Sequence, residues 1–442
     1  MAFKTEMKRL IKRFIPLFLL QQYSNMITKS KKRKELSIIN GINEKYDVLL
    51  RKKKDKPIYD VIFFMMVASN WKYDSVYRII DQHPSFKPIV VIYPLLTYGE
   101  EVSMKELNAA KRFCEEHHYK FRVPWDQSKK QWIDIKNEVD PDIVFFSNPY
   151  LHSLEMYYIT NFMDCLTCYV PYSIRQERIF DIKFNTFFQN IVWRNYYESD
   201  IQLDLAKEYA RNKGNNVVVT GYPIIDIIRK ANPINTSWKK QDKVKKRIIW
   251  APHWTFQETS LDWSSFLIYY DFMLELALEY QSELQFSFKP HPLLKTTLSK
   301  DNLWGEDRTN HYYEVWENLP YGQLDETDYV ELFASSDALI HDCGSFMIEY
   351  LAVNKPVLYL LNKPDISNRF NDFGILAYDC HYKAHSREDI KTFINSVLFK
   401  NADPLKSNRE LFCEKALQFS NGYAADRIVK DICKNLNIHI TN

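Results

Sequence analysis

Strand-like and helix-like patterns of apolar residues alternate along most of this chain. From Tyr59 onward, continuous apolar runs are followed by segments in which apolar residues recur at helical spacing. In the first half, these patterns predict helices over 72–83 and 103–118 and strands over 59–69, 87–96, 120–125, 141–150, 165–172 and 215–226. Strands that alternate with helices are typical of a parallel sheet covered by helices, so the pattern predicts an α/β fold.

The alternation is interrupted once, by a polar stretch with the composition of a linker over 230–247. It resumes with strands expected over 247–254 and 285–292, a helix over 266–280 and a strand-helix-strand unit over 338–360. We therefore expect two Rossmann-like domains, 56–229 and 248–420, with parallel sheets facing a central cleft. A segment over 1–55 precedes them, and a C-terminal helix over 421–442 follows.

The unit at 338–360 carries polar residues where its first strand meets its helix. His341, Asp342, Gly344 and Ser345 occupy this turn, between the apolar runs 338–340 and 356–360. Ligands of parallel α/β sheets collect beyond the carboxyl ends of the strands, and a helix beginning near Gly344 would direct free N–H groups there. The turn is thus a candidate phosphate site. The alternative is that Asp342 and Ser345 merely cap the helix.

Two other loops of the second domain have similar chemistry. "WAPHW" places His253 after one predicted strand, and "FKPHP" places Lys289 and His291 after the next. If these strands are parallel neighbours of the strand before His341, all three loops meet at one edge of the sheet. A lone histidine is more often structural than functional, but three such loops together indicate a site for a diphosphate.

The N-terminal segment 1–55 is strongly basic, although the net charge of the whole chain is only +3. Basic clusters at 4–13, 29–34 and 51–54 surround an apolar run at 14–20, which is too short to span a bilayer. No small-residue cleavage site follows it, as a secretory signal would require. We expect this segment to lie on an anionic membrane surface, with an ordinary surface helix as the alternative. No nucleic-acid-binding module is recognisable.

Composition and cysteine usage narrow the class of protein further. With 442 residues, 46% hydrophobic and 26% charged, the chain is expected to fold into about two or three globular domains. Its seven cysteines are odd in number and scattered, so no disulfide framework is expected and a cytoplasmic location is favoured. Cys165 and Cys168 have C-x-x-C spacing without a second metal-binding pair, which indicates core thiols.

Several of these segments together resemble the CDP-glycerol glycerophosphotransferase family, whose members build teichoic acids and related polymers. The matching segments are "WAPHWTF", "FKPHP", "SSDALIHDCGSFMIEYLAVNKPVLYL", "NGYAADRIVKDI" and "VVVTGYPIID", and the resemblance covers roughly 140–435. It implies a GT-B architecture whose second domain holds the donor nucleotide without a bound metal or other cofactor. It also implies that His291 contacts the donor phosphates, that Asp342 and Ser345 line the nucleotide site, and that the segment near Arg427 closes the site or returns to the first domain.

The first domain departs from the family pattern. Members of the teichoic-acid type carry a histidine motif there, placed to act as a base on the acceptor hydroxyl. The matching place, "CYVPYSI" over 168–174, has no histidine. His152 is then the first candidate for this base, and Glu155 and Glu177 are others.

The leading hypothesis is a peripheral enzyme at the inner face of a bacterial membrane. It would move glycerol or ribitol phosphate from a CDP-activated donor to a lipid-linked or polysaccharide acceptor. A glycosyltransferase that uses a nucleotide sugar in capsule or lipopolysaccharide synthesis is the alternative with the same fold. A nucleotide-binding scaffold without activity is a third, because the first-domain histidine is missing. The expected partners are thus a nucleotide-activated donor, its acceptor and an anionic membrane.

Overall fold

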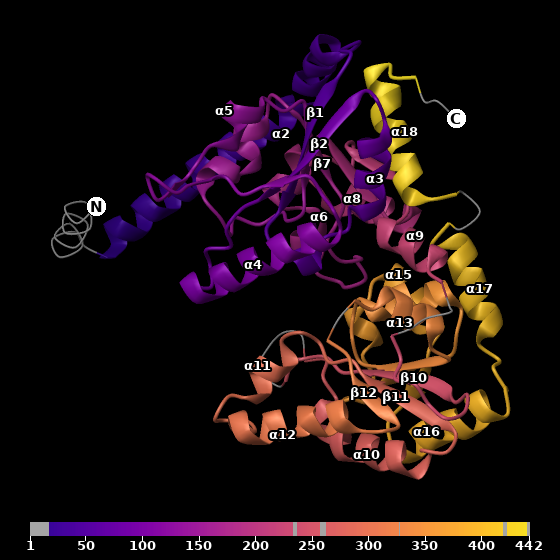
Figure 1. Ribbon diagram of the computed structural model, residues 1–442. Coiled ribbons are helices and arrows are strands. Elements are labelled where there is room, and N and C mark those ends of the chain that lie inside the picture. Colours follow the sequence, from indigo (N-terminus) through magenta and orange to yellow (C-terminus); the bar gives the residue numbers. More distant parts are fainter. Residues whose placement is uncertain (1–16, 233–236, 257–261, 327, 419–421, 440–442) are drawn as a thin grey trace.

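The computed structural model describes residues 17–232, 237–256, 262–326, 328–418 and 422–439. These residues form two lobes, each built on a parallel sheet, and the last helix of the described chain packs on the first lobe (Figure 1). The strand order is β3-β2-β1-β6-β7-β8-β9 in the first sheet and β12-β11-β10-β13-β14-β15 in the second. Both are doubly wound arrangements, as the alternating pattern predicts.

The first lobe covers its seven-stranded sheet with helices on both sides. Its strands are β1 (Tyr59–Met65), β2 (Phe86–Ile92), β3 (Phe121–Arg122), β6 (Ile143–Phe146), β7 (Leu166–Tyr169), β8 (Arg194–Tyr197) and β9 (Val217–Val219). Its helices are α2 (Leu17–Lys53), α3 (Asp74–Gln82), α4 (Glu100–Glu116), α5 (Ile135–Val139), α6 (Phe180–Phe184), α7 (Phe187–Ile191), α8 (Asp200–Tyr209) and α9 (Pro223–Lys230). A small hairpin, β4 (Trp125–Asp126) and β5 (Gln131–Trp132), lies apart from the sheet.

The second lobe begins when the linker reaches β10. Its strands are β10 (Lys246–Ala251), β11 (Leu284–Phe288), β12 (Gly322–Leu324), β13 (Ala338–His341), β14 (Val357–Leu360) and β15 (Tyr382–Ala384). Its helices are α10 (Phe266–Glu279), α11 (Leu294–Leu298), α12 (Gly305–Asn318), α13 (Val330–Ser335), α14 (Phe346–Glu349), α15 (Asp372–Tyr378), α16 (Arg387–Thr392) and α17 (Lys406–Lys415). A π-helix over Phe393–Phe399 follows α16.

Aromatic side chains fill the cores of both sheets. Phe63 on β1 stacks on Phe145 of the neighbouring β6, with ring centroids 4.4 Å apart. In the second lobe, Trp250 on β10 lies 4.9 Å from Phe288 of β11, and all four side chains are fully buried. Strands buried on both faces need apolar residues at every position, which explains their continuous apolar runs.

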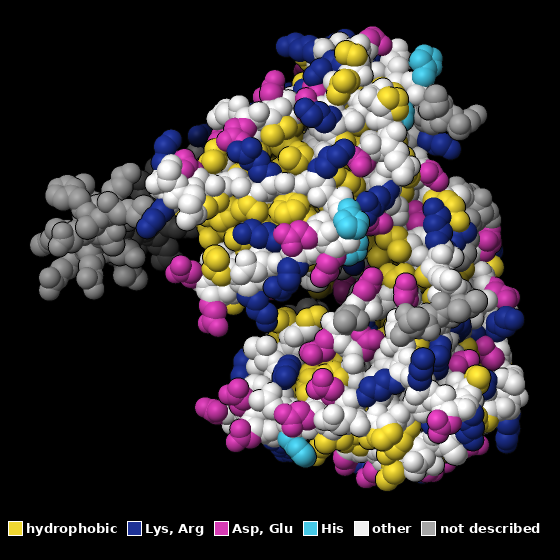
Figure 2. All heavy atoms as spheres, viewed as in Figure 1, with side chains coloured by type: hydrophobic (Ala, Val, Ile, Leu, Met, Phe, Trp, Pro, Cys, Tyr) yellow, Lys and Arg dark blue, Asp and Glu magenta, His cyan; other side chains and the backbone are white. Residues whose placement is uncertain are grey.

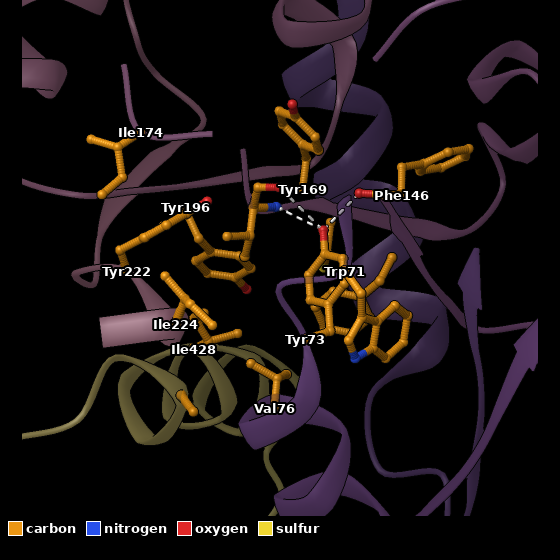
Figure 3. Close-up of a cluster of buried hydrophobic side chains, with 14 of the residues drawn as sticks. Trp71, Tyr73, Val76, Phe146, Tyr169, Ile174, Tyr196, Tyr222, Ile224 and Ile428 are labelled. Atoms are coloured by element: carbon orange, nitrogen blue, oxygen red, sulfur yellow. Dashed lines mark hydrogen bonds between the residues drawn. The ribbon is translucent and has the colours of Figure 1, made fainter. Parts of the chain in front are cut away.

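The C-terminal helix α18 (Ala424–Leu436) returns to the first lobe, where it packs on α3 and α9 (Figure 1). Figure 3 shows Ile428 of α18 beside Ile224 of α9, close to the buried Tyr73 and Val76. Tyr73 donates to the Phe146 carbonyl at 2.6 Å and accepts from the Val170 amide at 2.9 Å (Figure 3). The last helix of the chain is therefore part of the first lobe's core.

The segment "GYPIID" explains how α18 is held. Gly221 has a positive φ of 81°, and a side-chain carbon there would lie 2.6 Å from an Nη atom of Arg427, so the position favours glycine. Pro223 is the first residue of α9. The Asp226 carboxylate accepts hydrogen bonds from the amides of Ala424 and Ala425, at 3.0 and 2.9 Å. Asp226 thus satisfies the free N–H groups at the start of α18.

The C-terminal part of α2 is docked on the first lobe. Tyr46 lies 2.7 Å from the Thr167 hydroxyl and donates to the Ile191 carbonyl. Lys53 and Lys56 both bind the buried Asp142 at 2.6 Å. Burial raises the pKa of Asp142, but these hydrogen bonds outweigh it and hold the pKa below its usual value. This part of the predicted 1–55 segment is thus a helix on the surface of the lobe.

The side chains of the predicted membrane-binding run at 14–20 lie outside the described part of the structure. Among the described residues, none of the helices combines the length and apolar character needed to cross a bilayer.

The ends of several elements differ from the predictions made on sequence. The strand expected over 59–69 ends at Met65, and the strand expected over 215–226 ends at Val219 because Pro223 begins α9. The helix after Ser345 is one α-helical turn followed by a 3₁₀ turn over Tyr350–Val353, and its dipole is correspondingly small. All seven cysteines are buried free thiols, and the burial of Cys165 and Cys168 confirms the assignment of these two to the core.

Candidate functional site

The three polar loops predicted to meet do so at one edge of the second sheet. β10 lies between β11 and β13, and Ala251 at the end of β10 pairs with His341 at the end of β13. The loop after β11 is hydrogen-bonded to the loop after β10, since the His291 amide donates to the Pro252 carbonyl at 3.1 Å. This edge faces the first lobe, and Figure 2 shows a recess between the two lobes.

His253 and His291 form a pair of imidazoles with their ring centroids 4.9 Å apart. Burial lowers the pKa of His291 to about 4, and burial together with its neighbour lowers the pKa of His253 to about 3. Both rings are therefore neutral at pH 7. The Nδ1 atom of His291 accepts a hydrogen bond from the Leu293 amide at 3.1 Å, and that of His253 accepts one from the Thr255 amide at 3.3 Å. Each ring then carries its proton on Nε2, where it can donate to an anion without a charge of its own.

Lys289 lies beside this pair as a buried cation. Its ammonium group is 3.4 Å from Asp325, which follows β12, and the side chains are 7% and 5% exposed. Burial lowers the pKa of Lys289, and the charge of Asp325 opposes this effect. Sequence reasoning missed Asp325, because the run "LDETD" has the composition of a helix start rather than of a strand end.

Asp342 holds the loops together rather than lining the cleft, which corrects its predicted role as a ligand contact. One carboxylate oxygen accepts from the His253 amide at 2.5 Å, and the other accepts from the amide and hydroxyl of Ser265 at 2.6 and 2.7 Å. The side chain is fully buried, which raises its pKa to about 6 despite these hydrogen bonds. Asp342 thereby fixes the position of His253 relative to the turn at 343–345.

His341 is also fully buried, so its predicted contact with a ligand is wrong for the same reason. Its Nδ1 accepts from the Cys343 amide at 3.1 Å, and its ring lies against Tyr359 and His381. Burial lowers its pKa to about 3. His341 is the last residue of β13, and alternation along the strand directs its side chain into the core.

Gly344 and Ser345 are partly exposed at the turn, in the position predicted for a phosphate contact. The Ser345 hydroxyl does not cap α14, so the alternative that Ser345 serves only as a helix cap does not hold. A side-chain carbon at Gly344 would lie 2.9 Å from the Gln176 amide nitrogen. Gln176 belongs to the first lobe, so the glycine lets the two lobes approach closely at this turn.

The first lobe presents His152 and a group of tyrosines. His152 Nδ1 lies 2.9 Å from the Thr97 hydroxyl, and its ring centroid is 5.4 Å from that of Tyr150. The hydroxyls of Tyr150 and Tyr172 are 3.5 Å apart. Burial raises the pKa of Tyr150, and the hydroxyl of Tyr172 adds to the effect. These residues follow β6 and β7, at the carboxyl edge of the first sheet.

Backbone hydrogen bonds join the lobes directly beside these residues. The Arg178 amide donates to the Arg369 carbonyl at 2.9 Å, and the Asn371 amide donates to the Gln176 carbonyl at 2.8 Å. The Asn371 side chain also donates to the Arg175 carbonyl at 3.0 Å. Sequence reasoning missed this contact, which has no local signal because its two segments are far apart in the chain.

Arg427 lies on α18 against Gly221, where its guanidinium is 3.5 Å from Gln418. Burial lowers the pKa of Arg427. The family resemblance implied that the segment near Arg427 either closes the site or returns to the first domain. The structure shows the return to the first lobe.

A cavity of about 720 Å³ lies between α3 and α9 of the first lobe and α13 of the second. Asp74, Arg78, Lys230 and Glu331 are among its lining residues. None of the residues predicted to bind the donor is among them, so this cavity is separate from the candidate site. Among the described residues, no cluster of three His, Cys, Asp or Glu side chains could hold a metal ion.

Solved structures with two parallel-sheet lobes share this fold. The wall teichoic acid polymerase TagF, a variant soaked with CDPG, aligns with a TM-score of 0.57 and 14% identity over 94% of this chain and 98% of its own. The Staphylococcus aureus MnaA-UDP structure aligns with a TM-score of 0.56 and 14% identity, covering 86% and 98% of the two chains. The UDP-GlcNAc 2-epimerase from Neisseria meningitidis, bound to UDP-GlcNAc, gives 0.54 and 13%, covering 85% and 99%. The fold is therefore of the GT-B type.

Residues 197–434 match the family model described as CDP-Glycerol:Poly(glycerophosphate) glycerophosphotransferase. The chain belongs to this family, which is one of transferases. A teichoic acid glycerol-phosphate primase from Bacillus spizizenii is 23% identical over 247 residues, or 54% of this chain. The alignment spans 57% of the primase's length.

Proposed function

We propose that this protein transfers a polyol phosphate from a CDP-activated donor to a lipid-linked or polysaccharide acceptor in bacterial cell-surface polymer synthesis. The transferred group is glycerol phosphate or ribitol phosphate. The observation that carries the proposal is the family match over 197–434, which contains all three polar loops of the second lobe and most of α18. The geometry supports it, because these loops gather donors for an anion at one sheet edge.

The donor diphosphate would lie between the His253–His291 pair and the turn at Gly344 and Ser345. Both imidazoles present Nε2–H donors, and Ser345 offers a hydroxyl that α14 does not use. Preorganised donors of this kind stabilise the charge that develops on a leaving nucleotide. In this proposal His291 acts on the reacting phosphate and Lys289 adds positive charge. Arg427, on α18, packs against Gly221 and helps to hold α18 on the first lobe. A protein-bound metal has no part in it.

The acceptor would enter from the first lobe, beside His152 and the tyrosines at 150 and 172. Tyrosine rings suit contact with the faces of sugars and polyols. A nucleotide-sugar donor remains the second candidate, since the GT-B fold is shared with the UDP-GlcNAc 2-epimerase bound to UDP-GlcNAc. We further propose that the basic segment before residue 35 places the enzyme on the inner face of the membrane, near a lipid-linked acceptor.

A thermal-shift screen of the purified full-length protein tests the proposal. A ligand that binds the native state raises the melting temperature. CDP-glycerol, CDP-ribitol and CDP should stabilise the protein, whereas UDP, GDP and their sugar derivatives should not. Replacing His291 with Gln should abolish the shift caused by CDP, and His311→Gln, on the exposed face of α12, should leave it unchanged. Stabilisation by UDP-sugars alone would establish the second candidate instead.

A further inference from the structure

The loop after β7 continues into the contact between the two lobes. Glu177 lies on this loop and forms an isolated antiparallel bridge with Phe370 of the second lobe. The neighbouring Arg178 amide donates to the Arg369 carbonyl, and the Arg178 guanidinium donates to the Phe370 carbonyl at 2.7 Å. Backbone pairing on both sides thus fixes Glu177 at the boundary of the cleft.

This position brings the Glu177 carboxylate to the donor turn. A side-chain carbon at Gly344 would lie 3.9 Å from Glu177 Oε1. Gly344 precedes Ser345, which the proposed function assigns to the donor phosphates. A carboxylate from the acceptor lobe is therefore in reach of the turn that holds the donor, which is the geometry a base needs.

The carboxylate has a compensating charge and an oxygen that is not committed to a hydrogen bond. Glu177 Oε2 lies 3.3 Å from the Lys183 ammonium group, and the two side chains are 16% and 14% exposed. The ion pair is not aligned as a hydrogen bond, so the buried Oε2 lacks a hydrogen-bond partner among the described residues. Lys183 offsets the cost of keeping this charge partly buried, and Oε1, the oxygen that faces Gly344, is the atom placed to accept a proton.

His152 is placed less favourably for the same task. Its Nδ1 is engaged with Thr97, and its ring lies between Tyr98 and Tyr150, all from the first lobe. Glu177, in contrast, is fixed against the second lobe by its backbone. Tyr150 is near both groups, because its ring centroid lies 5.4 Å from that of His152 and the charge of Glu177 acts on its hydroxyl. This arrangement suits His152 for binding the acceptor and Glu177 for removing its proton.

We propose that Glu177 is the general base that activates the acceptor hydroxyl, an assignment that rests on the proposed function. The acceptor oxygen forms a bond to the phosphorus that carries the polyol, and the bond from this phosphorus to the CMP oxygen breaks. CMP leaves with the bonding electron pair, and the acceptor proton passes to the Glu177 carboxylate. Charge and atoms balance without a metal, oxidant or further reactant.

The test compares Glu177→Gln with the wild-type protein, using CDP-glycerol and a synthetic lipid-linked disaccharide and measuring CMP release. Glutamine keeps the backbone bridge to Phe370 but cannot accept the proton. The expected result is a fall in kcat on the order of a hundredfold or more, with the CDP-glycerol thermal shift unchanged. The decline of kcat at low pH, caused by protonation of the base, should disappear. Glu116→Gln, which alters an exposed carboxylate on α4 of the same lobe, is the matched control and should behave like the wild type.

The outcomes separate this inference from the proposed function. If Glu177→Gln keeps kcat within a few-fold and retains the low-pH decline, Glu177 is not the base. If His152→Gln shows the large loss in kcat rather than a raised acceptor KM, the base is His152. If the wild-type protein uses a UDP-sugar and not CDP-glycerol, the proposed function fails. The Glu177→Gln comparison with that sugar donor still decides the role of Glu177, because transfer to an anomeric carbon also requires loss of the acceptor proton.

Discussion

At the edge of the second sheet where the three polar loops meet, buried polar side chains form hydrogen bonds with neighbouring segments. Asp342 is the clearest case, because its two oxygens serve three donors on two other segments. A carboxylate that accepts several hydrogen bonds specifies geometry, although burial makes its charge costly. His253, whose amide it binds, consequently has a fixed backbone beside the expected diphosphate.

The histidine pair makes stability depend on pH in a predictable direction. The folded-state pKa of His291 is about 4, below its ordinary value of 6.5, so the unfolded chain binds more protons between these values. The stability that the neutral ring contributes is present above pH 6.5 and is lost as the pH falls toward 4. We expect the wild-type protein to lose more stability between pH 7.5 and 5.5 than His291→Gln does, by up to about 1.4 kcal/mol per pH unit within the window.

Urea unfolding at the two pH values measures this difference. Subtracting the variant from the wild type cancels the contributions of titrating groups that are distant from His291. His311→Gln, which alters an exposed histidine, should match the wild type at both pH values. An equal loss of stability in the wild type and His291→Gln would show that His291 is not held neutral by burial.

At the scale of elements, a polar side chain on one helix caps another helix that is far away in the sequence. Asp226 on α9 binds the first two amides of α18, about two hundred positions later. The side chain acts as a cap supplied from another helix, with its charge at the positive end of the helix dipole. Asp226, rather than α18 itself, therefore fixes where the last helix begins.

Replacing Asp226 with Ala should weaken the attachment of α18. The loss of a cap costs about 0.5–2 kcal/mol, and the two buried amides would also lose their acceptors. Hydrogen exchange of the α18 amides should accelerate more than exchange in β1. Asp426→Asn, which changes a charge in the same helical turn without removing the cap, should have a smaller effect. Unchanged exchange in α18 would contradict the assignment of Asp226 as its cap.

At the scale of the whole molecule, the proposed function divides the binding of donor and acceptor between the two lobes. The second lobe supplies the histidine pair and the turn at 344–345, and the first supplies His152, the tyrosines and Glu177. They meet in the backbone contact between 175–178 and 369–371, and α18 ties the far end of the chain to the first lobe. The helix α2 extends from the first lobe (Figure 1). Lys32, Arg33 and Lys34 on this helix are exposed.

This layout predicts electrostatic binding to anionic membranes. Changing the exposed residues Lys32, Arg33 and Lys34 to Gln should weaken binding to phosphatidylglycerol vesicles on the order of a hundredfold, since each basic residue near the surface contributes about 1 kcal/mol. Co-sedimentation measures this change, and added salt should weaken wild-type binding in the same way. As the control, Lys240, Lys243 and Lys245 in the linker between the lobes are changed to Gln. Undiminished binding of the 32–34 variant would exclude a role for these residues at the membrane.

Much of the fold and part of the site could be predicted from local patterns. Apolar runs located most strands because both faces of a parallel strand are buried. The polar loops with His253, His291 and Ser345 could be placed at one sheet edge because parallel topology brings strand ends together. The ends of strands were predicted less well, as at Met65 and Val219, since the apolar pattern continues into the next turn.

The sequence by itself determined the two α/β lobes, the linker and the three loops at the donor edge, because apolar periodicity and the order of elements suffice for these features. The tertiary structure decided which of the polar residues face inward. Asp342 and His341 belong to the interior because hydrogen bonds from other segments and the alternation of β13 direct them there. It also decided that Glu177 reaches Gly344 and that Asp226 caps α18. Such pairs are distant in the chain, and their contact depends on the packing of whole lobes.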